Sequence, residues 1–305
     1  MAQSRFRTDR QLSARMITVM GTLVLAYAAA IAILTFVLGR WWPLGIAAVV
    51  GFFVFQMLAS DKVALMAAGA HEVTPEQEPE LHALADRLCV LADMPKPTLA
   101  VAETSVLNAF AAGRKRKSVV LCVTRGMIDK LDEQELEGVL AHELSHVAHG
   151  DAVVMTVASF VGVLAGLTAQ VGARLMMIAG RMRGLWQFLV IAIAITLLAT
   201  ATWLVSVLLI RTLSRYREFA ADQAAAQLTG NPAALSSALV KVSSARHSLI
   251  PSQDLRRATT VNAFAFCPVA GGKQTGSKLG ARLLSTHPTV EARIERLERV
   301  AQRLG

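Results

Sequence analysis

Four long apolar runs limit what this 305-residue chain can fold into more than any other feature of its sequence. The runs cover residues 16–38, 42–59, 153–179 and 185–210, and three of the four carry no charged residue. A helix needs about 20 predominantly apolar residues to cross a bilayer. A single run of this kind is compatible with a buried core helix, but soluble domains seldom hold four that are apolar on every side. The sequence therefore predicts four transmembrane helices.

Basic residues around the runs predict their orientation. Arginines gather before the first run and after the fourth, at Arg5, Arg7, Arg10, Arg15, Arg211, Arg215 and Arg217. The hairpins inside the two pairs of runs carry fewer, namely Arg40, Arg181 and Arg183. The positive-inside rule then places both polar blocks in the cytoplasm, as expected for a multi-pass protein of the plasma (inner) membrane. The net charge of +9 fits a lipid surface better than nucleic acid, because the basic residues flank the apolar runs.

The resulting organisation has five parts. A basic tail (1–15) precedes the first membrane pair (16–59), a polar block (60–152), the second membrane pair (153–210) and a second polar block (211–305). Because a pair of membrane crossings separates the two blocks, they lie on the same side and can combine into one domain.

The polar blocks combine helices with short strands. In the first block, Thr74-Pro75-Glu76 predicts a helix start, and residues 98–104 and 118–124 predict two strands. In the second block, a helix continues from the fourth run to Gly230, and Asn231-Pro232 opens another. Residues 250–285 are rich in Gly, Ser, Thr and Lys and predict a loop. The closing helix is amphipathic, with an apolar face of Val290, Ile294, Leu297, Ala301 and Leu304. The predicted fold is mainly α, with a small antiparallel sheet.

The stretch VLAHELSHVAHGD, residues 139–151, has the spacing of a metal site. Asp132 followed by Glu135 predicts the start of its helix and Gly150 predicts its end. His142 and His146 then lie one turn apart, so both imidazoles can bind one zinc ion. Glu143 is better placed to take a proton from water that the metal activates. The alternative is a polar helix face without a metal.

A third ligand is needed, and acidic residues are few enough to suggest one. Between residues 147 and 290 they are Asp151, Glu218, Asp222 and Asp254. Glu218 as ligand gives a His₂Glu set with an open fourth position, the pattern of catalytic zinc. Asp222, one turn further on, can accept the free ring N–H of a ligand histidine. The alternative is that both carboxylates only solvate their helix.

Four segments together resemble one family. HELSH, EFAAD (218–222), LNAFAAG (107–113) and STHPTVEARIERL (285–297) look like the membrane-embedded gluzincin proteases, which include HtpX-like proteins and the CAAX prenyl endoprotease. The resemblance implies a zincin-like catalytic domain with one zinc ion per chain, bound by His142, His146 and Glu218. It also implies that Asn108, Ala109 and Phe110 form an edge strand that pairs with substrate, and that His287 stabilises the oxyanion.

These features predict a membrane-bound zinc endopeptidase that acts at the cytoplasmic membrane face in quality control of damaged or misfolded membrane proteins. Two alternatives remain open at this point. One is a dedicated processing protease for a single peptide or lipidated substrate, and the other is a non-catalytic zinc-binding scaffold. The expected partners are peptide or protein substrates and the lipid bilayer, without nucleic acid. The sequence specifies no oligomeric state.

Overall fold

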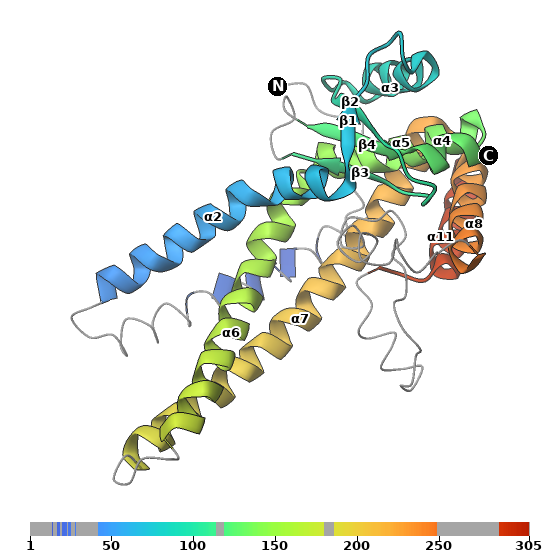
Figure 1. Cartoon of the computed structure of the whole chain (residues 1–305). Helices are drawn as coiled ribbons and strands as arrows, with labels where there is room; N and C mark the ends of the chain where they lie inside the picture. Colours follow the sequence, from blue (N-terminus) through green and yellow to red (C-terminus); the bar gives the residue numbers. More distant parts are fainter. Residues whose placement is uncertain are drawn as a thin grey trace.

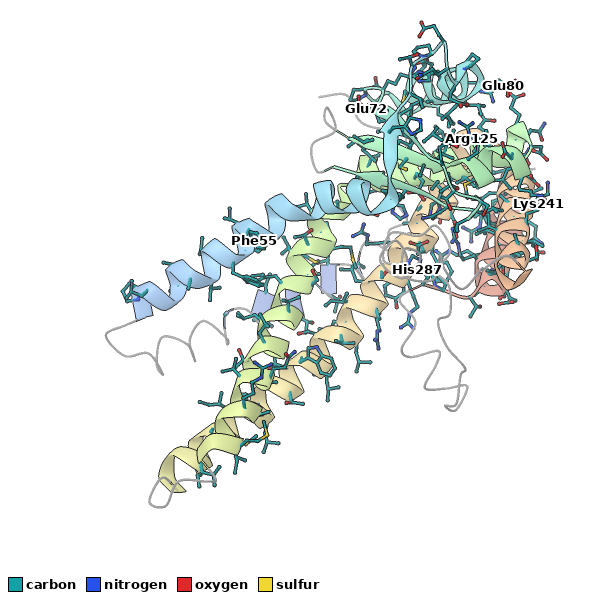
Figure 2. All side chains as sticks on the ribbon, in the orientation of Figure 1. Phe55, Glu72, Glu80, Arg125, Lys241 and His287 are labelled. Atoms are coloured by element: carbon teal, nitrogen blue, oxygen red, sulfur yellow. The ribbon has the colours of Figure 1, made fainter. Side chains whose placement is uncertain are left out.

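A computed structural model of the chain describes residues 42–113, 119–179, 186–248 and 287–304, together with scattered positions between 14 and 28. Most of the first apolar run and the whole predicted loop 250–285 lie outside the described residues. Three helices, α2 (Trp42–Ala68), α6 (Asp151–Ala179) and α7 (Trp186–Thr229), extend from one end that holds the sheet and the shorter helices (Figure 1). Charged side chains such as Glu72, Glu80, Arg125 and Lys241 lie at that end, whereas Phe55 lies on α2 (Figure 2).

Helices α6 and α7 pack side by side and carry the apolar surface. Within the described residues, the segments Asp151–Arg174 and Ala192–Thr229 are long and apolar enough to cross a membrane. Little of either segment is buried inside the protein, and Leu197 and Leu204 are examples of its exposed apolar side chains. Exposed apolar surface on this scale is typical of a membrane contact. Helix α2 contributes a shorter apolar stretch, so the arrangement with four transmembrane helices stays a prediction.

The sheet is mixed, and the expectation of an antiparallel sheet is wrong in this respect. Its strands are β1 (Ala70–Glu72), β2 (Thr98–Ala102), β3 (Ala109–Ala112) and β4 (Val120–Thr124), in the order β1-β2-β4-β3. The pairs β1–β2 and β3–β4 are antiparallel, but β2 and β4 are parallel. The reason is that the chain between the two predicted strands itself forms β3. Strand β3 pairs with the far side of β4 and leaves β2 and β4 as parallel neighbours.

Helix α5 (Glu133–His149) begins and ends as its sequence predicts. The Asp132 side chain accepts a hydrogen bond from the Glu135 N–H at 2.9 Å, and the Glu135 side chain accepts one from the Asp132 N–H at 3.0 Å. This reciprocal pair satisfies two backbone donors that the first helical turn leaves free. At the other end, Gly150 adopts a left-handed conformation with φ 68°, which glycine takes without steric cost. Helix α6 then starts at Asp151.

Helix α3 (Pro79–Ala92) starts later than its sequence predicts. Thr74 and Gln77 instead form a turn, in which the Thr74 carbonyl accepts from the Gln77 N–H at 3.0 Å and the Gln77 side chain accepts from the Thr74 N–H at 2.9 Å. A second proline, Pro79, then opens the helix, where its missing N–H costs nothing. The short helix α4 (Arg125–Lys130) follows β4.

One hydrophobic core joins residues from both polar blocks. Helices α8 (Pro232–Ser248) and α11 (Val290–Leu304) come from the second block and pack against α5 and α7. The core includes Leu81, Leu88, Leu140, Leu144, Leu235, Leu239 and Leu297. A Cβ atom added at Gly138 would lie 3.3 Å from Leu235 Cα, so the missing side chain lets α5 and α8 approach closely.

The buried face of α11 differs from the predicted apolar face. Leu297 is buried as expected, but Ala301 and Leu304 are exposed and Val300 is buried instead. Arg293 is also buried on this face. The physical reason is an ion pair with α7, described below, which turns the Arg293 side of the helix toward the protein.

Candidate metal centre

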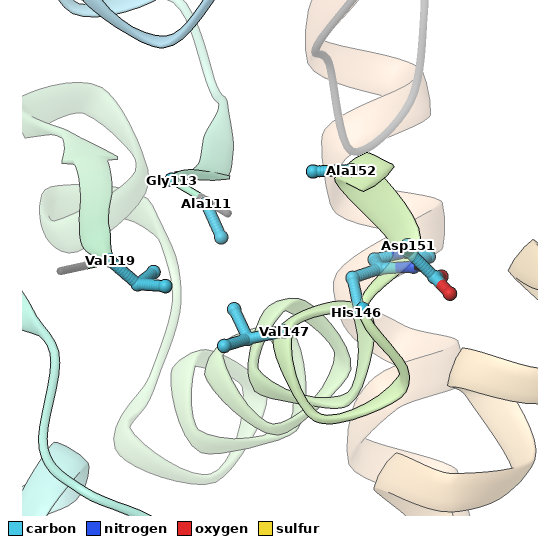
Figure 3. Close-up of a pocket in the computed structure, with 8 residues that line it drawn as sticks. Ala111, Gly113, Val119, His146, Val147, Asp151 and Ala152 are labelled. Atoms are coloured by element: carbon cyan, nitrogen blue, oxygen red, sulfur yellow. Dashed lines mark hydrogen bonds and ion pairs between the residues drawn. The ribbon is translucent and has the colours of Figure 1, made fainter. Parts of the chain in front are cut away.

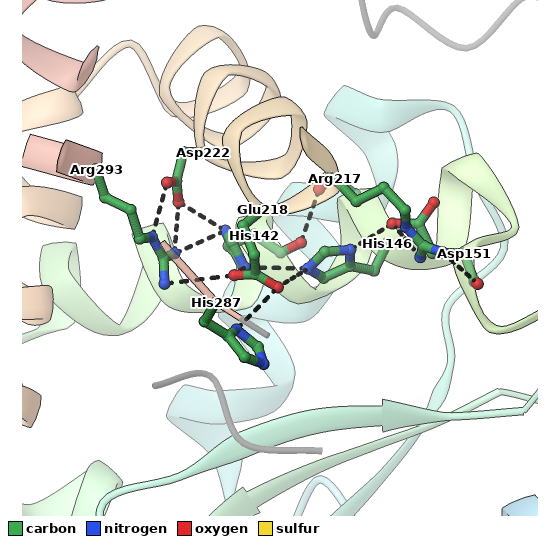
Figure 4. Close-up of polar contacts among 9 residues, drawn as sticks. His142, His146, Asp151, Arg217, Glu218, Asp222, His287 and Arg293 are labelled. Atoms are coloured by element: carbon green, nitrogen blue, oxygen red, sulfur yellow. Dashed lines mark hydrogen bonds and ion pairs between the residues drawn. The ribbon is translucent and has the colours of Figure 1, made fainter. Parts of the chain in front are cut away.

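Two helices bring the three predicted ligands together. Helix α5 carries His142 and His146, and α7 carries Glu218 where it passes beside α5 (Figure 4). The donor atoms of these three residues all lie within 4.8 Å of one another. His142 and Glu218 are buried, and His146 is half-buried.

The distances fit one metal ion. The two histidine Nε2 atoms are 3.1 Å apart, and Glu218 oxygens lie 3.6 Å from the His142 Nε2 and 3.8 Å from the His146 Nε2. Ligands bound tetrahedrally at zinc–nitrogen distances near 2.0–2.1 Å lie about 3.3 Å from one another. Glu218 Oε2 is buried and accepts no hydrogen bond within the described part of the chain. Arg293 Nη1 lies 3.4 Å from this oxygen, an ion-pair contact that makes no hydrogen bond, so the oxygen still has a place for a bound cation.

His142 is held by a buried ion pair. Its Nδ1 lies 3.0 Å from Asp222 Oδ1, and the carboxylate can only accept, so Nδ1 carries the proton and Nε2 faces the metal position. Arg293 of α11 binds the same carboxylate through two of its nitrogens, at 2.6 and 2.8 Å. Asp222 and Arg293 are both 1% exposed. Asp222 therefore lies where it can orient the His142 ring, as predicted, and Arg293 holds the Asp222 carboxylate in place.

His146 has a matching arrangement on its other side. Its Nδ1 lies 2.5 Å from Asp151 Oδ2, at the first residue of α6. Arg217 of α7 binds Asp151 twice, through the side-chain oxygen at 2.6 Å and the backbone carbonyl at 2.7 Å. Each predicted ligand histidine is thus oriented by an aspartate that an arginine holds in place, and such a partner fixes the ring and its tautomer.

The electrostatics distinguish the two histidines and the glutamate between them. Burial lowers the pKa of His142, but hydrogen bonds to Asp222 and Glu218 outweigh it and raise the pKa overall. The pKa of His146 is lowered by burial and by the neighbouring His142. The two neighbouring rings therefore differ in proton affinity, and a metal ion bound between them would compete with protons for the same nitrogen atoms. Burial raises the pKa of Glu143, and a raised pKa makes a carboxylate a stronger base toward a proton of water.

His287, which precedes α11, lies beside the predicted third ligand, Glu218. Its Nδ1 is 3.3 Å from Glu218 Oε1, and Figure 4 shows its ring on the side of Glu218 opposite α7. The structure thus places His287 at the candidate metal centre, and its role toward an oxyanion stays a prediction.

The predicted edge strand lies at an edge of the sheet. Strand β3 pairs only with β4 among the described strands. Asn108 just precedes it and is buried, where its carbonyl accepts from the Thr124 N–H at 2.9 Å. The Ala109 side chain joins the main core toward α5, whereas Phe110 packs on the other face with Ala100, Ala102, Ala112 and Cys122. Phe110 therefore supports the strand from the face that points away from α5.

Three residues of the site were not predicted from the sequence. Arg293 stands on the apolar face of its helix, three residues after Val290 and four before Leu297. A charged residue at such a position is the signal that a buried partner exists. Asp151 follows the helix-ending Gly150 directly, and Arg217 precedes Glu218. Nothing in the sequence around Asp151 or Arg217 indicates that these two residues contact each other in the fold.

Comparison with known proteins gives one consistent family. The model of Peptidase family M48 matches residues 75–301. The chain is 48% identical over 303 residues to Protease HtpX homolog 1 of Streptomyces coelicolor, covering 99% of this chain and 97% of that protein. It is 40% identical over 302 residues to Protease HtpX homolog 2 of Methanosarcina acetivorans, covering 99% of each.

A solved structure shares the fold. The crystal structure of S. mikatae Ste24p matches with a TM-score of 0.50 at 16% identity, covering 95% of this chain and 66% of that one. This likeness concerns the fold alone. The sequence matches extend over nearly the whole chain and support a metalloprotease. The chain belongs to peptidase family M48.

Proposed function

We propose that the protein is a membrane-bound, zinc-dependent endopeptidase that cleaves peptide bonds at the cytoplasmic membrane face. The observation that carries the proposal is the convergence of His142, His146 and Glu218 on one position, with Glu143 next in sequence to the first ligand. The donor set of two imidazoles and one carboxylate is typical of catalytic zinc, because it leaves a fourth position open.

The chain's own residues then divide the work. A zinc ion at this position supplies Lewis acidity, which lowers the pKa of water and polarises a carbonyl. Glu143 takes the proton of the attacking water and delivers it to the leaving amine. Asp222 and Asp151 hold the two ligand rings in the required tautomer. His287, beside Glu218, donates to the oxygen that becomes negative as the carbonyl is attacked.

The position of β3 supports a peptide as substrate. An extended peptide can add to a free strand edge through main-chain hydrogen bonds, which gives affinity with little sequence preference. Such binding suits damaged or misfolded membrane proteins, whose sequences vary, and we include their removal in the proposed function. The apolar helices α6 and α7 begin and end beside the site, which favours substrates in or near the bilayer.

The test is cleavage of an unfolded protein such as casein by the full-length chain, purified in detergent and loaded with zinc. Glu143→Gln and a chelated sample are run beside it. We expect cleavage only by the unmutated, zinc-bound chain, with Glu143→Gln at least about 1,000-fold slower at unchanged zinc content, since it loses the proton carrier of the reaction. Cleavage by Glu143→Gln at the original rate would remove Glu143 from its role. Full zinc content without cleavage in any form would favour a scaffold.

A further inference from the structure

A small cavity lies between the sheet and the metal centre. Its walls are the end of the β3–β4 hairpin, the last turn of α5 and the start of α6 (Figure 3). The lining residues are Ala111, Gly113, Val119, His146, Val147, Gly150, Asp151 and Ala152. One end of the cavity is thus formed by a predicted metal ligand with its aspartate, and the opposite wall by the strand proposed to bind substrate.

The register of β3 shows how a peptide would reach this cavity. In an antiparallel pair, residues alternate between those that bond their partner and those that point their N–H and C=O outward. The Asn108 carbonyl accepts a hydrogen bond from the Thr124 N–H, so Asn108 and Thr124 form a hydrogen-bonded pair. The next pair, Ala109 with Val123, is a non-hydrogen-bonded pair, in which the N–H and C=O groups point away from the partner strand. The edge of β3 that faces away from β4 therefore presents the backbone groups of Ala109 and Ala111.

The side chains on this strand place the cavity on one face. Ala109 belongs to the core beneath α5 and Ala111 packs against that core, whereas Phe110 belongs to the opposite face. A peptide paired to β3 alternates its own side chains in the same way. Those on the α5 face extend beside Ala111, and Figure 3 shows the Ala111 side chain directed toward Val147 across the cavity.

The size and chemistry of the cavity limit what can enter. Its volume is about 40 Å³, whereas one water requires roughly 10–15 Å³ on this scale. The space is open on one side, and its inner part matches a short aliphatic group better in size than an aromatic ring. Apart from His146 and Asp151, which bind each other, the lining side chains are alanine and valine.

We propose that this cavity selects the substrate, by accepting a small aliphatic side chain, from alanine to valine in size, on the residue that adjoins the scissile bond. The inference rests on the proposed peptidase function and adds its substrate preference. Val147 and Ala152 set the size limit, because they face the space from two helices and neither is a proposed ligand.

The experiment uses peptides in a host sequence that otherwise lacks small aliphatic residues, with Gly, Ala, Val, Leu or Phe at one guest position. The zinc-loaded full chain in detergent should cleave beside Ala or Val with a kcat/KM at least about tenfold above that for Phe, the discrimination usual for a filled apolar pocket. Val147→Ala should shift the preference toward Leu, and Ala152→Leu should shift it toward Gly and Ala. Opposite shifts in two variants cannot come from a general loss of stability.

A matched control is Val120→Ala, at a half-buried valine of the same hairpin on the opposite face. It should leave the ranking of guests unchanged. Binding supplies a readout that does not depend on turnover. In the Glu143→Gln background, the dissociation constants of the same labelled peptides should follow the same order and shift in the same directions with the two cavity variants.

The outcomes separate the two proposals. Zinc-dependent cleavage with a ranking that neither cavity variant changes would overturn the cavity's role and leave the peptidase function standing. Absence of both cleavage and peptide binding in every form would overturn both.

Discussion

A buried carboxylate lies near each end of helix α5, and the two carboxylates differ in how many hydrogen bonds they accept. At the N-terminal end, Glu135 accepts hydrogen bonds from Ser237 and Lys241, each at 2.6 Å, as well as from the Asp132 backbone. Both of its oxygens are satisfied. At the C-terminal end, Glu218 approaches two histidines and an arginine and still has a buried oxygen without a hydrogen bond among the described residues.

This difference indicates that the Glu135 end contributes to the stability of the fold, whereas the Glu218 end is suited to bind a ligand. A fully satisfied buried network stabilises one structure, whereas a partly satisfied one has a cost that a native protein tolerates where a ligand completes it. Changes at the Glu135 end should therefore alter stability without altering metal binding. Changes at the Glu218 end should alter metal binding first. Four predictions test whether stability and metal binding can be changed separately. The first concerns Arg293, which lies at the metal end but should also affect stability.

Arg293 should give the largest effect, since it belongs to the metal end yet holds α11 in place. Arg293→Met leaves Asp222 buried without its cation, so we expect a loss of about 3–5 kcal/mol in the free energy of unfolding. Thermal unfolding in detergent, with the metal removed, measures it. Arg299→Met on the same helix is the control, because Arg299 is 60% exposed and should change stability by less than about 0.5 kcal/mol. Equal effects of both variants would show that the Arg293 ion pair adds nothing to the fold.

Glu218→Gln should lower zinc affinity more than about 100-fold, since loss of a direct ligand should exceed the 10–100-fold typical of a residue behind a ligand. The unfolding temperature of the metal-free protein should fall less than in Glu135→Gln, because the contacts of Glu218 with His287 and Arg293 are 3.3 and 3.4 Å long, whereas Glu135 accepts two hydrogen bonds of 2.6 Å. Competition with a chelator measures the zinc affinity, and thermal unfolding measures the stability of the metal-free protein. Glu135→Gln is the matched variant at the other end and should show the reverse pattern. Full zinc affinity in Glu218→Gln would exclude Glu218 as a ligand.

Asp222→Asn and Asp151→Asn should each weaken zinc binding by about 10–100-fold, because each removes the acceptor that fixes a ligand ring. Asp222 should have the greater effect, since its environment is fully buried and His146 is 20% exposed. The same chelator competition measures both, with Asp86→Asn at an exposed ion pair as the control. An unchanged affinity in Asp151→Asn would mean that His146 needs no support from α6.

The smallest predicted effect is a dependence of stability on pH at the N-terminal end. Burial raises the pKa of Glu135, but hydrogen bonds from Lys241, Ser237 and the Asp132 N–H outweigh it and lower the pKa overall. A lowered pKa in the folded state contributes stability above the unfolded value of about 4.3, and that stability is lost as the pH falls through the folded pKa.

The measurement compares the unfolding temperature of the unmutated chain and Glu135→Gln between about pH 6 and pH 3, across the unfolded pKa of about 4.3. The variant should lose less stability on acidification than the unmutated chain. Glu133→Gln, at an exposed position of the same first turn, should follow the unmutated chain. Identical acid profiles for Glu135→Gln and the unmutated chain would contradict the prediction.

Local sequence predicted the elements whose signals are local. The capping pair Asp132 and Glu135, the end of α5 at Gly150 and the restart of a helix at Pro232 were all predicted correctly. The mixed sheet was not, because the direction of a strand depends on which neighbour it meets. The start of α3 was misplaced because the Thr74 turn competes with the helix for the same backbone groups.

The sequence by itself determined the candidate ligand types, their spacing on α5 and the apolar runs, because these follow from helix periodicity and from length. It also left Glu218 as the only glutamate between residues 147 and 290. Only the tertiary structure decided which aspartate contacts each histidine and which arginine binds that aspartate. Arg293 lies 151 residues from His142 along the chain, and Arg217 lies 66 residues from Asp151. Such partners are chosen by packing, because a buried charge is stable only where the fold brings its counter-charge within reach.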